Sequence, residues 1–408
     1  MDKEKLLARF ISYTEFETTS MSETETFPSS EKQLVFARFL EKELRNIGLS
    51  NISLDEKGYL LATLPANNDN SLPVIGFLAH MDTSSEASGA NVRAQLHESY
   101  QGNDVIINRE KNILLSPKLF PELLNYVGQD IITTDGNTLL GADDKAGISE
   151  IVTACEYLIA HPELKHGEVR IAFTPDEEVG RGTDFFPVNN FNADFAYTID
   201  GGQIGELNYE TFNACDAKIF IRGRSVHPGY AKGKMINAIT LAAEWQAALP
   251  AGERPEYTDG YDGFFHINKI NGSTDGVILH MIIRDHNAQL LEKKKEIVLE
   301  LASFMNRKYG HGTIKCELKD VYANMKIYIE KSYDIVDRAI KAMEKSSVTP
   351  KVIPVRGGTD GARLSAMGLL CPNIFTGGHN FHGIYEYIPL QSMLKATEVI
   401  INIIIDSK

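Results

Sequence analysis

The feature that most limits the fold of this chain is a series of short apolar runs that alternate with helical patterns. Each run is long enough for one strand and carries apolar residues at consecutive positions, as strands buried on both faces of a sheet do. The runs comprise residues 60–64, 74–79, 169–173 and 195–199. Helical stripes of apolar residues occupy 30–48 and 148–159. The alternation predicts an α/β domain with a mixed, mostly parallel sheet and helices on both of its faces.

The first helical pattern carries its own boundary signals. Ser30 and Gln33 have the spacing of a capping box, in which two side chains satisfy free amides at the start of a helix. Gly48 follows the last apolar residue and is typical of a helix end. These signals predict a helix over residues 30–48.

The pattern changes after about residue 208, where strands and helices follow in the order βαββαβ. The predicted elements comprise residues 217–222, 236–249, 264–270, 277–283, 288–309 and 313–318. This order is typical of a ferredoxin-like α+β domain. A helix over 334–345 and an apolar segment over 371–375 then resume the α/β pattern of the first part of the chain. We therefore predict a catalytic domain in two parts, 1–207 and 323–408, interrupted by an inserted lid domain over 208–322.

Charge and cysteine content exclude several classes of function. The chain has 41 Lys and Arg against 55 Asp and Glu, a net charge of −14, which repels nucleic acids and anionic membrane surfaces. Its four cysteines have no CxxC spacing, which argues against a disulfide scaffold and a zinc knuckle. The first residues lack the apolar region of a signal peptide, and residues 399–405 are too short for a membrane span. We expect a cytoplasmic protein that binds neither nucleic acid nor membrane.

Polar clusters follow the predicted strands at the edge where open α/β sheets bind ligands. They comprise His80-Met81-Asp82, Asp176-Glu177-Glu178, Asp200-Gly201-Gly202 and His379-Asn380-Phe381-His382. A further cluster, GADDKAG at 141–147, stands directly before a helical stripe. Residues 85–130, by contrast, show no clean period of apolar residues and are expected to be mostly loop. We expect the polar clusters to converge on one crevice.

The cluster at 80–82 combines a histidine with a carboxylate, and the GADDKAG cluster holds two adjacent carboxylates. Residues i and i+2 of extended backbone point the same way, so Asp82 could accept the imidazole proton of a metal-bound His80. Taken alone, a histidine such as His80 is more often a hydrogen-bonded core or rim residue than a metal ligand, and Asp82 alone is similarly ambiguous. One carboxylate of Asp143 and Asp144 could simply cap the following helix. The second adjacent carboxylate needs a cation, and an Asp that uses both oxygens can bridge two metal ions.

The remaining clusters also suit a metal. Glu177 and Glu178 repel each other unless solvent or cations relieve them, and one could bind metal while the other acts as a general base. His379 and His382 are both candidate ligands, and spacing alone does not choose between them. Asp, Glu and His without Cys suit Zn²⁺, Mn²⁺ or Co²⁺. Because GxSxG, Walker A, HExxH and GxGxxG motifs are absent from the sequence, metal-assisted hydrolysis is the favoured chemistry.

A resemblance assigns the individual roles. The motifs, in chain order, are HMDTS, TTDGNTLLGADDKAG, AFTPDEEVGRG, YTIDGG, SVHPGYAKGKMINA, PVRGGTDGARLS and TGGHNFHG. They resemble the tripeptide aminopeptidase family of the dizinc aminoacylase and carboxypeptidase superfamily, along nearly the whole chain. The resemblance implies two zinc ions per chain: His80 and Asp200 on one, Glu178 and His382 on the other, and Asp143 bridging them.

The same resemblance implies a mechanism. Glu177 would be the base that activates a water between the metals, and Asp82 would be the partner of His80. The products would be the N-terminal residue of a tripeptide and a dipeptide. For substrate binding, the resemblance points to His227 as a group that stabilises the oxyanion, and the residue types suggest Arg284 and Arg356 for the substrate carboxylate. An ion pair within the fold is the alternative for both arginines, as a local hydrogen bond is for Asn237, a further candidate contact.

Several alternatives share these residues. A dipeptidase, a carboxypeptidase or an N-acyl amino acid deacylase of the same superfamily would use nearly the same ligands. A metal-dependent phosphohydrolase could also use Asp and His ligands, with the Asp pair of GADDK as a nucleophile. A noncatalytic binding protein is disfavoured because Glu177 and every proposed ligand are present. Whether the lid domain forms a homodimer is left open by the sequence.

Overall fold

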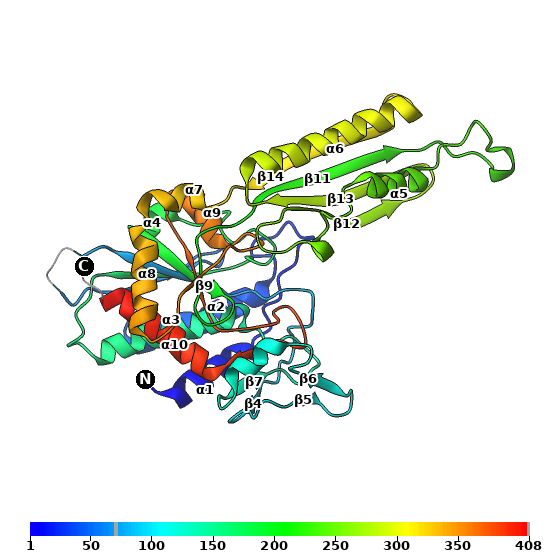
Figure 1. Cartoon of the computed structure of the whole chain (residues 1–408). Coiled ribbons are helices and arrows are strands. Elements are labelled where there is room, and N and C mark those ends of the chain that lie inside the picture. Colours follow the sequence, from blue (N-terminus) through cyan, green and yellow to red (C-terminus); the bar gives the residue numbers. More distant parts are fainter. Residues whose placement is uncertain (69–71, 406–408) are drawn as a thin grey trace. The chain divides into compact units, whose positions relative to one another are not determined.

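The computed structural model describes residues 1–68 and 72–405 as two compact units (Figure 1). The first unit comprises Met1–Tyr209, Ile327–Ile353 and Thr359–Lys408, and the second comprises Glu210–Lys326 and Pro354–Gly358. We call them the catalytic unit and the inserted unit. Among the described residues, no helix combines the length and the apolar character that a membrane crossing requires.

An eight-stranded sheet organises the catalytic unit. Its order is β1 (Ser50–Leu54), β2 (Leu60–Leu64), β8 (Val169–Thr174), β3 (Ile75–His80), β9 (Phe195–Gly201), β16 (Asn373–Phe375), β10 (Glu206–Asn208) and β15 (Lys351–Val352). The central strands β8, β3, β9 and β16 run parallel to one another, whereas β2 runs antiparallel to both of its neighbours, β1 and β8. The carboxyl ends of the central strands therefore meet at one edge.

Helices cover both faces of this sheet. On one face, Leu78 and Ala196 pack with Phe191 and Leu364 of two short helices. On the other face lies the long helix that follows the GADD motif. The helices of this unit are α1 (Lys3–Thr14), α2 (Glu31–Ile47), α3 (Ala142–Ala160), α4 (Val188–Phe191), α8 (Asp334–Lys345), α9 (Asp360–Ala366) and α10 (Leu390–Ile405), with α7 (Lys326–Ile329) at the boundary of the units.

Helix α3 approaches the sheet closely because residue 147 is glycine. A Cβ at Gly147 would lie 2.0 Å from the carbonyl oxygen of Ile199 in β9 and 2.5 Å from Oδ1 of Asp144. No other residue fits there without moving the helix. The start of α3 is thereby held beside the end of β9, where Asp200 lies.

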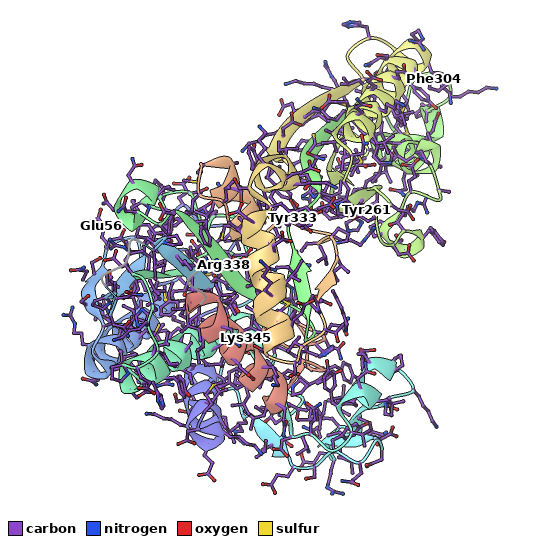
Figure 2. The ribbon with its side chains drawn as sticks, turned by 60° about the vertical axis from the view of Figure 1, so that its left-hand side comes forward. Glu56, Tyr261, Phe304, Tyr333, Arg338 and Lys345 are labelled. Carbon is purple, nitrogen blue, oxygen red and sulfur yellow. The ribbon has the colours of Figure 1, made fainter. Side chains whose placement is uncertain are left out.

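Helix α8 illustrates how the surface helices are anchored. Figure 2 labels Arg338 and Lys345 along it, with Tyr333 just before its first residue. Its buried stripe includes Ile335 and Ala339, and Arg338 donates a hydrogen bond of 3.0 Å to the carbonyl oxygen of Ile403 in α10. Two helices that are far apart in the sequence are thus joined side by side.

Residues 85–130, which were expected to be mostly loop, contain several very short elements. Two small sheets are formed by β17 (Tyr387–Pro389), β7 (Ile131–Thr133) and β4 (Gln95–His97), and by β5 (Val105–Asn108) and β6 (Ile113–Leu115), beside a 3₁₀ helix over Pro121–Tyr126. Strands of three or four residues are too short to show a period in the sequence.

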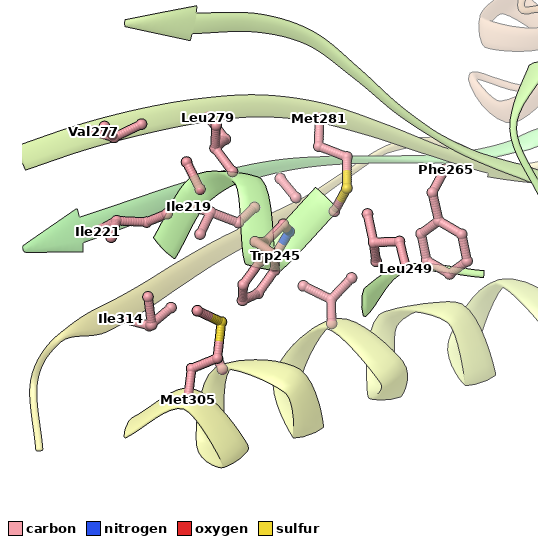
Figure 3. Packing of buried hydrophobic residues seen from close by; sticks show 14 of the residues in the cluster. Ile219, Ile221, Trp245, Leu249, Phe265, Val277, Leu279, Met281, Met305 and Ile314 are labelled. Atoms are coloured by element: carbon pink, nitrogen blue, oxygen red, sulfur yellow. The ribbon is translucent and has the colours of Figure 1, made fainter. Parts of the chain in front are cut away.

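The inserted unit follows the predicted βαββαβ order. Its elements are β11 (Asn213–Arg222), α5 (Ala238–Ala248), β12 (Phe264–Gly272), β13 (Gly276–Asp285), α6 (Ala288–Tyr309) and β14 (Ile314–Tyr322), with short 3₁₀ turns over Pro228–Tyr230 and Pro255–Tyr257. The antiparallel sheet has the order β12-β13-β11-β14. Figure 3 shows Trp245 between strand residues such as Leu279 and Met281 and the helix residue Met305. Alternate residues of the strands form one continuous apolar face under the two helices.

The predicted fold class is confirmed: a mixed α/β sheet with helices on both faces, interrupted by an inserted α+β domain. The predicted helix at 30–48 is present as α2, but the capping box is wrong in one part. Ser30 accepts a hydrogen bond from the amide of Lys32, whereas the Gln33 side chain binds Asp176 instead of turning back to the helix start. A buried acid elsewhere in the fold offers Gln33 a stronger, charge-assisted partner.

Candidate metal centre

Acidic and histidine side chains gather at the carboxyl ends of the central strands. His80 is the last residue of β3, Asp200 lies near the end of β9, and Glu177 and Glu178 follow β8. Asp143 comes from the start of α3, which the close contact at Gly147 holds against β9. The strand ends thus bring together groups from widely separated parts of the sequence.

The histidine of β3 lies at the centre of two candidate ligand groups. One group is His80, Asp144 and Asp200, and the other is His80, Asp143 and Glu178; within each, the ligand atoms lie within 4.8 Å of one another. Nε2 of His80 is 2.9 Å from Oδ1 of Asp143 and 3.5 Å from Oδ1 of Asp200. One imidazole nitrogen therefore faces carboxylates from two different elements.

Asp143 lies between two histidines. Its Oδ1 faces His80, and its Oδ2 is 3.2 Å from Nε2 of His382. The same His382 nitrogen is 3.0 Å from Oε2 of Glu178. A carboxylate with one oxygen toward each histidine has the arrangement that a bridging ligand needs.

The donor set fits divalent metal ions. Oε1 of Glu178 and Oδ1 of Asp144 are buried without a hydrogen-bond partner in the described part of the chain, which is costly for groups that carry charge. All the donors are imidazole nitrogens or carboxylate oxygens, as in zinc, manganese and cobalt sites. Bound cations would satisfy these oxygens and offset the repulsion among the acids.

The protonation of this cluster reflects its burial and its mixture of charges. Burial raises the pKa of Glu178 to about 7 and that of Asp200 to about 6. Burial also raises the pKa of Glu177 well above its usual range, while His80 opposes this rise and Asp200 supports it. The pKa of Asp143 is lowered despite its burial because His382 and His80 both donate hydrogen bonds to it. Asp143 is thus the acid of this cluster that most readily stays ionised.

Asp82 has two tasks. Nδ1 of His80 is 3.0 Å from the backbone oxygen of Asp82 and 3.4 Å from its Oδ1, so this residue faces the imidazole nitrogen that is turned away from Asp143. The Asp82 carboxylate also accepts hydrogen bonds from the backbone amides of Glu177, at 2.9 Å, and Glu178, at 3.2 Å. The second task, which the sequence did not indicate, fixes the backbone of the loop that carries the candidate base.

The two histidines that sequence spacing could not separate differ clearly in the structure. His379 forms a hydrogen bond of 2.7 Å with the hydroxyl of Tyr126 and stacks on Tyr387, with ring centroids 4.6 Å apart. Burial lowers the pKa of His379 to about 4. His382 instead faces Asp143 and Glu178. The geometry favours His382 as the ligand and gives His379 a place in an aromatic cluster.

The four candidate substrate residues lie in the inserted unit, each with local contacts. Asn237 caps α5 by accepting a hydrogen bond from the amide of Ile239, and His227 accepts one from Gly229. Nη1 of Arg284 is 3.3 Å from Oδ1 of Asp216. The structural alternatives named for Asn237 and Arg284 are therefore present, with Asp216 as the ion-pair partner of Arg284.

Arg356 is the most extensively bound of the four. It donates hydrogen bonds to the backbone oxygens of Gly260, at 2.9 Å, and Asp262, at 2.8 Å, and to the hydroxyl of Thr258, at 2.8 Å. Its guanidinium also lies over the ring of Phe212. These contacts give Arg356 a structural task in holding the loop at 258–262.

Three further acids lie in or beside the cluster, of which only Asp144 was singled out from the sequence, as a member of the Asp143-Asp144 pair. Asp144 belongs to one candidate ligand group and accepts a hydrogen bond of 3.1 Å from the amide of His80. Asp360, in the motif RGGTDGARLS, is buried and accepts a hydrogen bond of 2.8 Å from Thr174 at the end of β8. Glu386 binds the loop of Asp143. The resemblance assigned the bridging role to Asp143 and gave no role to Asp144, Asp360 or Glu386.

Comparisons with known proteins agree with the geometry. A profile described as the peptidase dimerisation domain matches residues 209–313. The peptidase T of Caldanaerobacter subterraneus subsp. tengcongensis is 56% identical over 400 residues, which cover 98% of each chain. A tripeptidase structure from Staphylococcus aureus shares the fold with a TM-score of 0.78, at 19% identity over 99% of this chain and 98% of that one. A Bacillus subtilis structure, described as a dinuclear metal-binding peptidase of the M20 family, aligns with a TM-score of 0.64 at 13% identity over 99% and 97%.

Proposed function

The chain belongs to the peptidase T family of M20 metallopeptidases, and from this premise we propose that it is a zinc-dependent aminopeptidase that releases the N-terminal residue of tripeptides. The observation that carries the proposal is the position of Asp143, with one carboxylate oxygen toward His80 and the other toward His382. The donors around this carboxylate suit two divalent metal ions, and Asp143 would be a ligand that the two ions share.

The residues that would hold two zinc ions follow from this position. His80 and Asp200 would hold one ion, Glu178 and His382 the other, and Asp143 would be shared. The ions would polarise the scissile carbonyl and make water a stronger nucleophile near neutral pH. Asp144 lies close enough to His80 and Asp200 to influence the metal ion that these two residues would hold.

Glu177 would move the proton. Its raised pKa suits a group that takes a proton from the attacking water and passes it to the leaving amine. Asp82 supports this role because its carboxylate holds the backbone amide of Glu177. The placement of the base thus depends on Asp82 as well as on the strand that precedes it.

The substrate class is the least constrained part of the proposal. The description of the Staphylococcus aureus structure as a tripeptidase supports tripeptides. A dipeptidase, a carboxypeptidase or an N-acyl amino acid deacylase remains the alternative, since all would use the same ligands.

A panel of peptides tests the proposal. We expect zinc-loaded protein to release the N-terminal residue from unblocked tripeptides, with a much lower kcat/KM for dipeptides and tetrapeptides and no cleavage of N-acetylated tripeptides. The measurement is chromatographic quantification of each product. Exclusive hydrolysis of N-acyl amino acids would favour a deacylase, and release of the C-terminal residue alone would favour a carboxypeptidase.

The substrate roles of the residues in the inserted unit stay predictions. We propose His227 for the oxyanion, and Arg284, Arg356 and Asn237 for contacts with the peptide. A change of His227 to Ala that lowers kcat with little effect on KM would support its role. For Arg356, a lower melting temperature with unchanged KM would instead assign it to the loop at 258–262.

Assembly and location complete the proposal. The match to a peptidase dimerisation domain supports a homodimer through the inserted unit, which sedimentation of the purified protein would test. The four cysteines are free thiols, which supports a reducing compartment such as the cytoplasm.

A further inference from the structure

Glu386 is a buried acid that binds a run of backbone amides. It is 1% exposed and directly precedes β17, four residues after His382. Oε2 accepts hydrogen bonds from the amides of Leu140, at 2.6 Å, and Gly141, at 3.0 Å. Oε1 accepts hydrogen bonds from the amides of Ala142, at 2.7 Å, and Asp143, at 3.2 Å. One carboxylate therefore accepts hydrogen bonds from four consecutive backbone amides.

The amides that Glu386 binds are those that lead into α3. Gly141 has a left-handed backbone with φ of 81°, and Asp143 departs from helical geometry, so this turn cannot satisfy its own amides in the usual helical way. An anion suits such a group of amides. Burial raises the pKa of Glu386 to about 7, while the hydrogen bonds from Gly141, Leu140 and Asp143 favour its ionised form.

The same contacts join two candidate metal ligands. Asp143 is bound to Glu386 through its backbone amide and to His382 through its side chain. His382 and Glu386 lie in one short segment, and β17 fixes the end of that segment by pairing Tyr387 with Thr133. The chain from His382 to Glu386 thus contacts Asp143 at both its backbone and its carboxylate.

We propose that Glu386 is a positioning residue for the metal centre: by binding the amides of residues 140–143, it sets the orientation of Asp143 toward His80 and His382. The proposal rests on the proposed dinuclear site. It assigns Glu386 no contact with substrate and no proton transfer. Its effect on catalysis would arise through metal binding.

The chemistry requires a carboxylate of this length. Glutamine has one acceptor oxygen, and its NH₂ group would face two of the amide donors. Aspartate keeps both oxygens but is one methylene shorter, so it cannot reach all four amides without movement of the loop. Glu150 offers a matched control because it is a buried Glu in α3 whose two oxygens have no hydrogen-bond partner in the described residues.

The experiment compares the metal affinity of four full-length proteins: wild type, Glu386→Gln, Glu386→Asp and Glu150→Gln. Each is stripped of metal and titrated with Zn²⁺ against a chromophoric chelator, with Co²⁺ absorption as a second readout of ligand geometry. We expect affinity to fall by about 10–100-fold in Glu386→Gln and by less in Glu386→Asp. Glu150→Gln should match wild type. At saturating zinc, Glu386→Gln should recover much of its kcat with an unchanged KM.

Each other outcome has a defined meaning. Affinity and Co²⁺ spectra of Glu386→Gln equal to those of wild type would overturn the proposal, as would an equal loss in Glu150→Gln. If Glu386→Gln does not fold, Glu386→Asp decides by the same titration. Failure of both to fold, with Glu150→Gln folded, would assign Glu386 to folding alone and also overturn the proposal. A wild type that binds no zinc would instead overturn the proposed function.

Discussion

The catalytic unit and the inserted unit treat buried charge in opposite ways. In the inserted unit, Lys294 pairs with Glu253 and lies 3.7 Å from Asp285, and Arg356 binds backbone oxygens. In the catalytic unit, acids crowd together at the strand ends, and Glu178 and Asp144 each keep a buried oxygen without a hydrogen-bond partner in the described chain. The difference teaches that charge satisfied within the fold supports architecture, whereas several acids that gather with unsatisfied oxygens at one sheet edge indicate where the molecule binds something else.

The largest effect that would sharpen this comparison is expected from Glu177→Gln. The variant keeps the size of the side chain and the amide contact to Asp82 but removes the proton acceptor. We expect kcat to fall by about 10²–10⁴-fold, the usual contribution of a general base, with zinc content unchanged. Steady-state kinetics with elemental analysis would check this. Full activity in the zinc-loaded variant would remove Glu177 from the mechanism.

A substitution in the core of the inserted unit should have the opposite effects: a loss of stability and no change in zinc binding. Ile219 is fully buried beneath the helices. Its truncation to Ala should destabilise the protein by about 2–5 kcal/mol, the cost of lost burial and a cavity. Zinc affinity should stay that of wild type. Chemical denaturation and a zinc titration measure the two quantities, and a parallel loss of zinc affinity would break the separation drawn between the units.

Metal removal should affect the catalytic unit. Because bound cations offset repulsion among the acids, zinc at about 100 times its dissociation constant should stabilise the fold by about 2.7 kcal/mol. Calorimetry with and without a chelator would measure the change in melting temperature. Identical transitions in both conditions, with no return of stability on adding zinc, would contradict a metal-binding cluster.

The smallest effect is a pH dependence at Glu150, an acid that is buried without a hydrogen-bond partner in the part of the chain that the structure describes. Burial raises its pKa in the folded state well above the ordinary 4.5. Its stabilising contribution is therefore complete below the unfolded-state pKa and is lost as pH rises through the folded-state pKa. Between pH 5 and pH 8, we expect the unfolding free energy of Glu150→Gln to gain on that of wild type by about 1.4 kcal/mol for each pH unit that lies below the folded-state pKa of Glu150.

Urea denaturation of both proteins at the two pH values measures this gain, and the comparison with wild type cancels the titration of the metal cluster. A difference in unfolding free energy that stays the same at both pH values would show that Glu150 is ionised in the folded protein at both, so that burial does not raise its pKa into this range.

Local patterns predicted much of this molecule, and distant contacts account for what they missed. Helix α6 has the predicted bounds because its stripe is long and periodic. His80 and Glu178 were singled out as candidate ligands because they stand at or shortly after the ends of apolar runs. The hydrogen bond between the Asp143 amide and the Glu386 carboxylate joins residues 243 positions apart, and no local sequence pattern predicts such a contact. Gln33 was misjudged for the same reason, since its partner Asp176 is 143 positions away.

The packing around Trp245 has a practical consequence. It is the only tryptophan in the chain and lies fully buried in the core of the inserted unit. Intrinsic tryptophan fluorescence therefore observes that unit alone, without a label or a mutation. A change in emission when peptide or metal is added would show that binding at the acidic cluster alters the surroundings of Trp245 in the inserted unit. A constant emission would show that the core of the inserted unit stays unaltered.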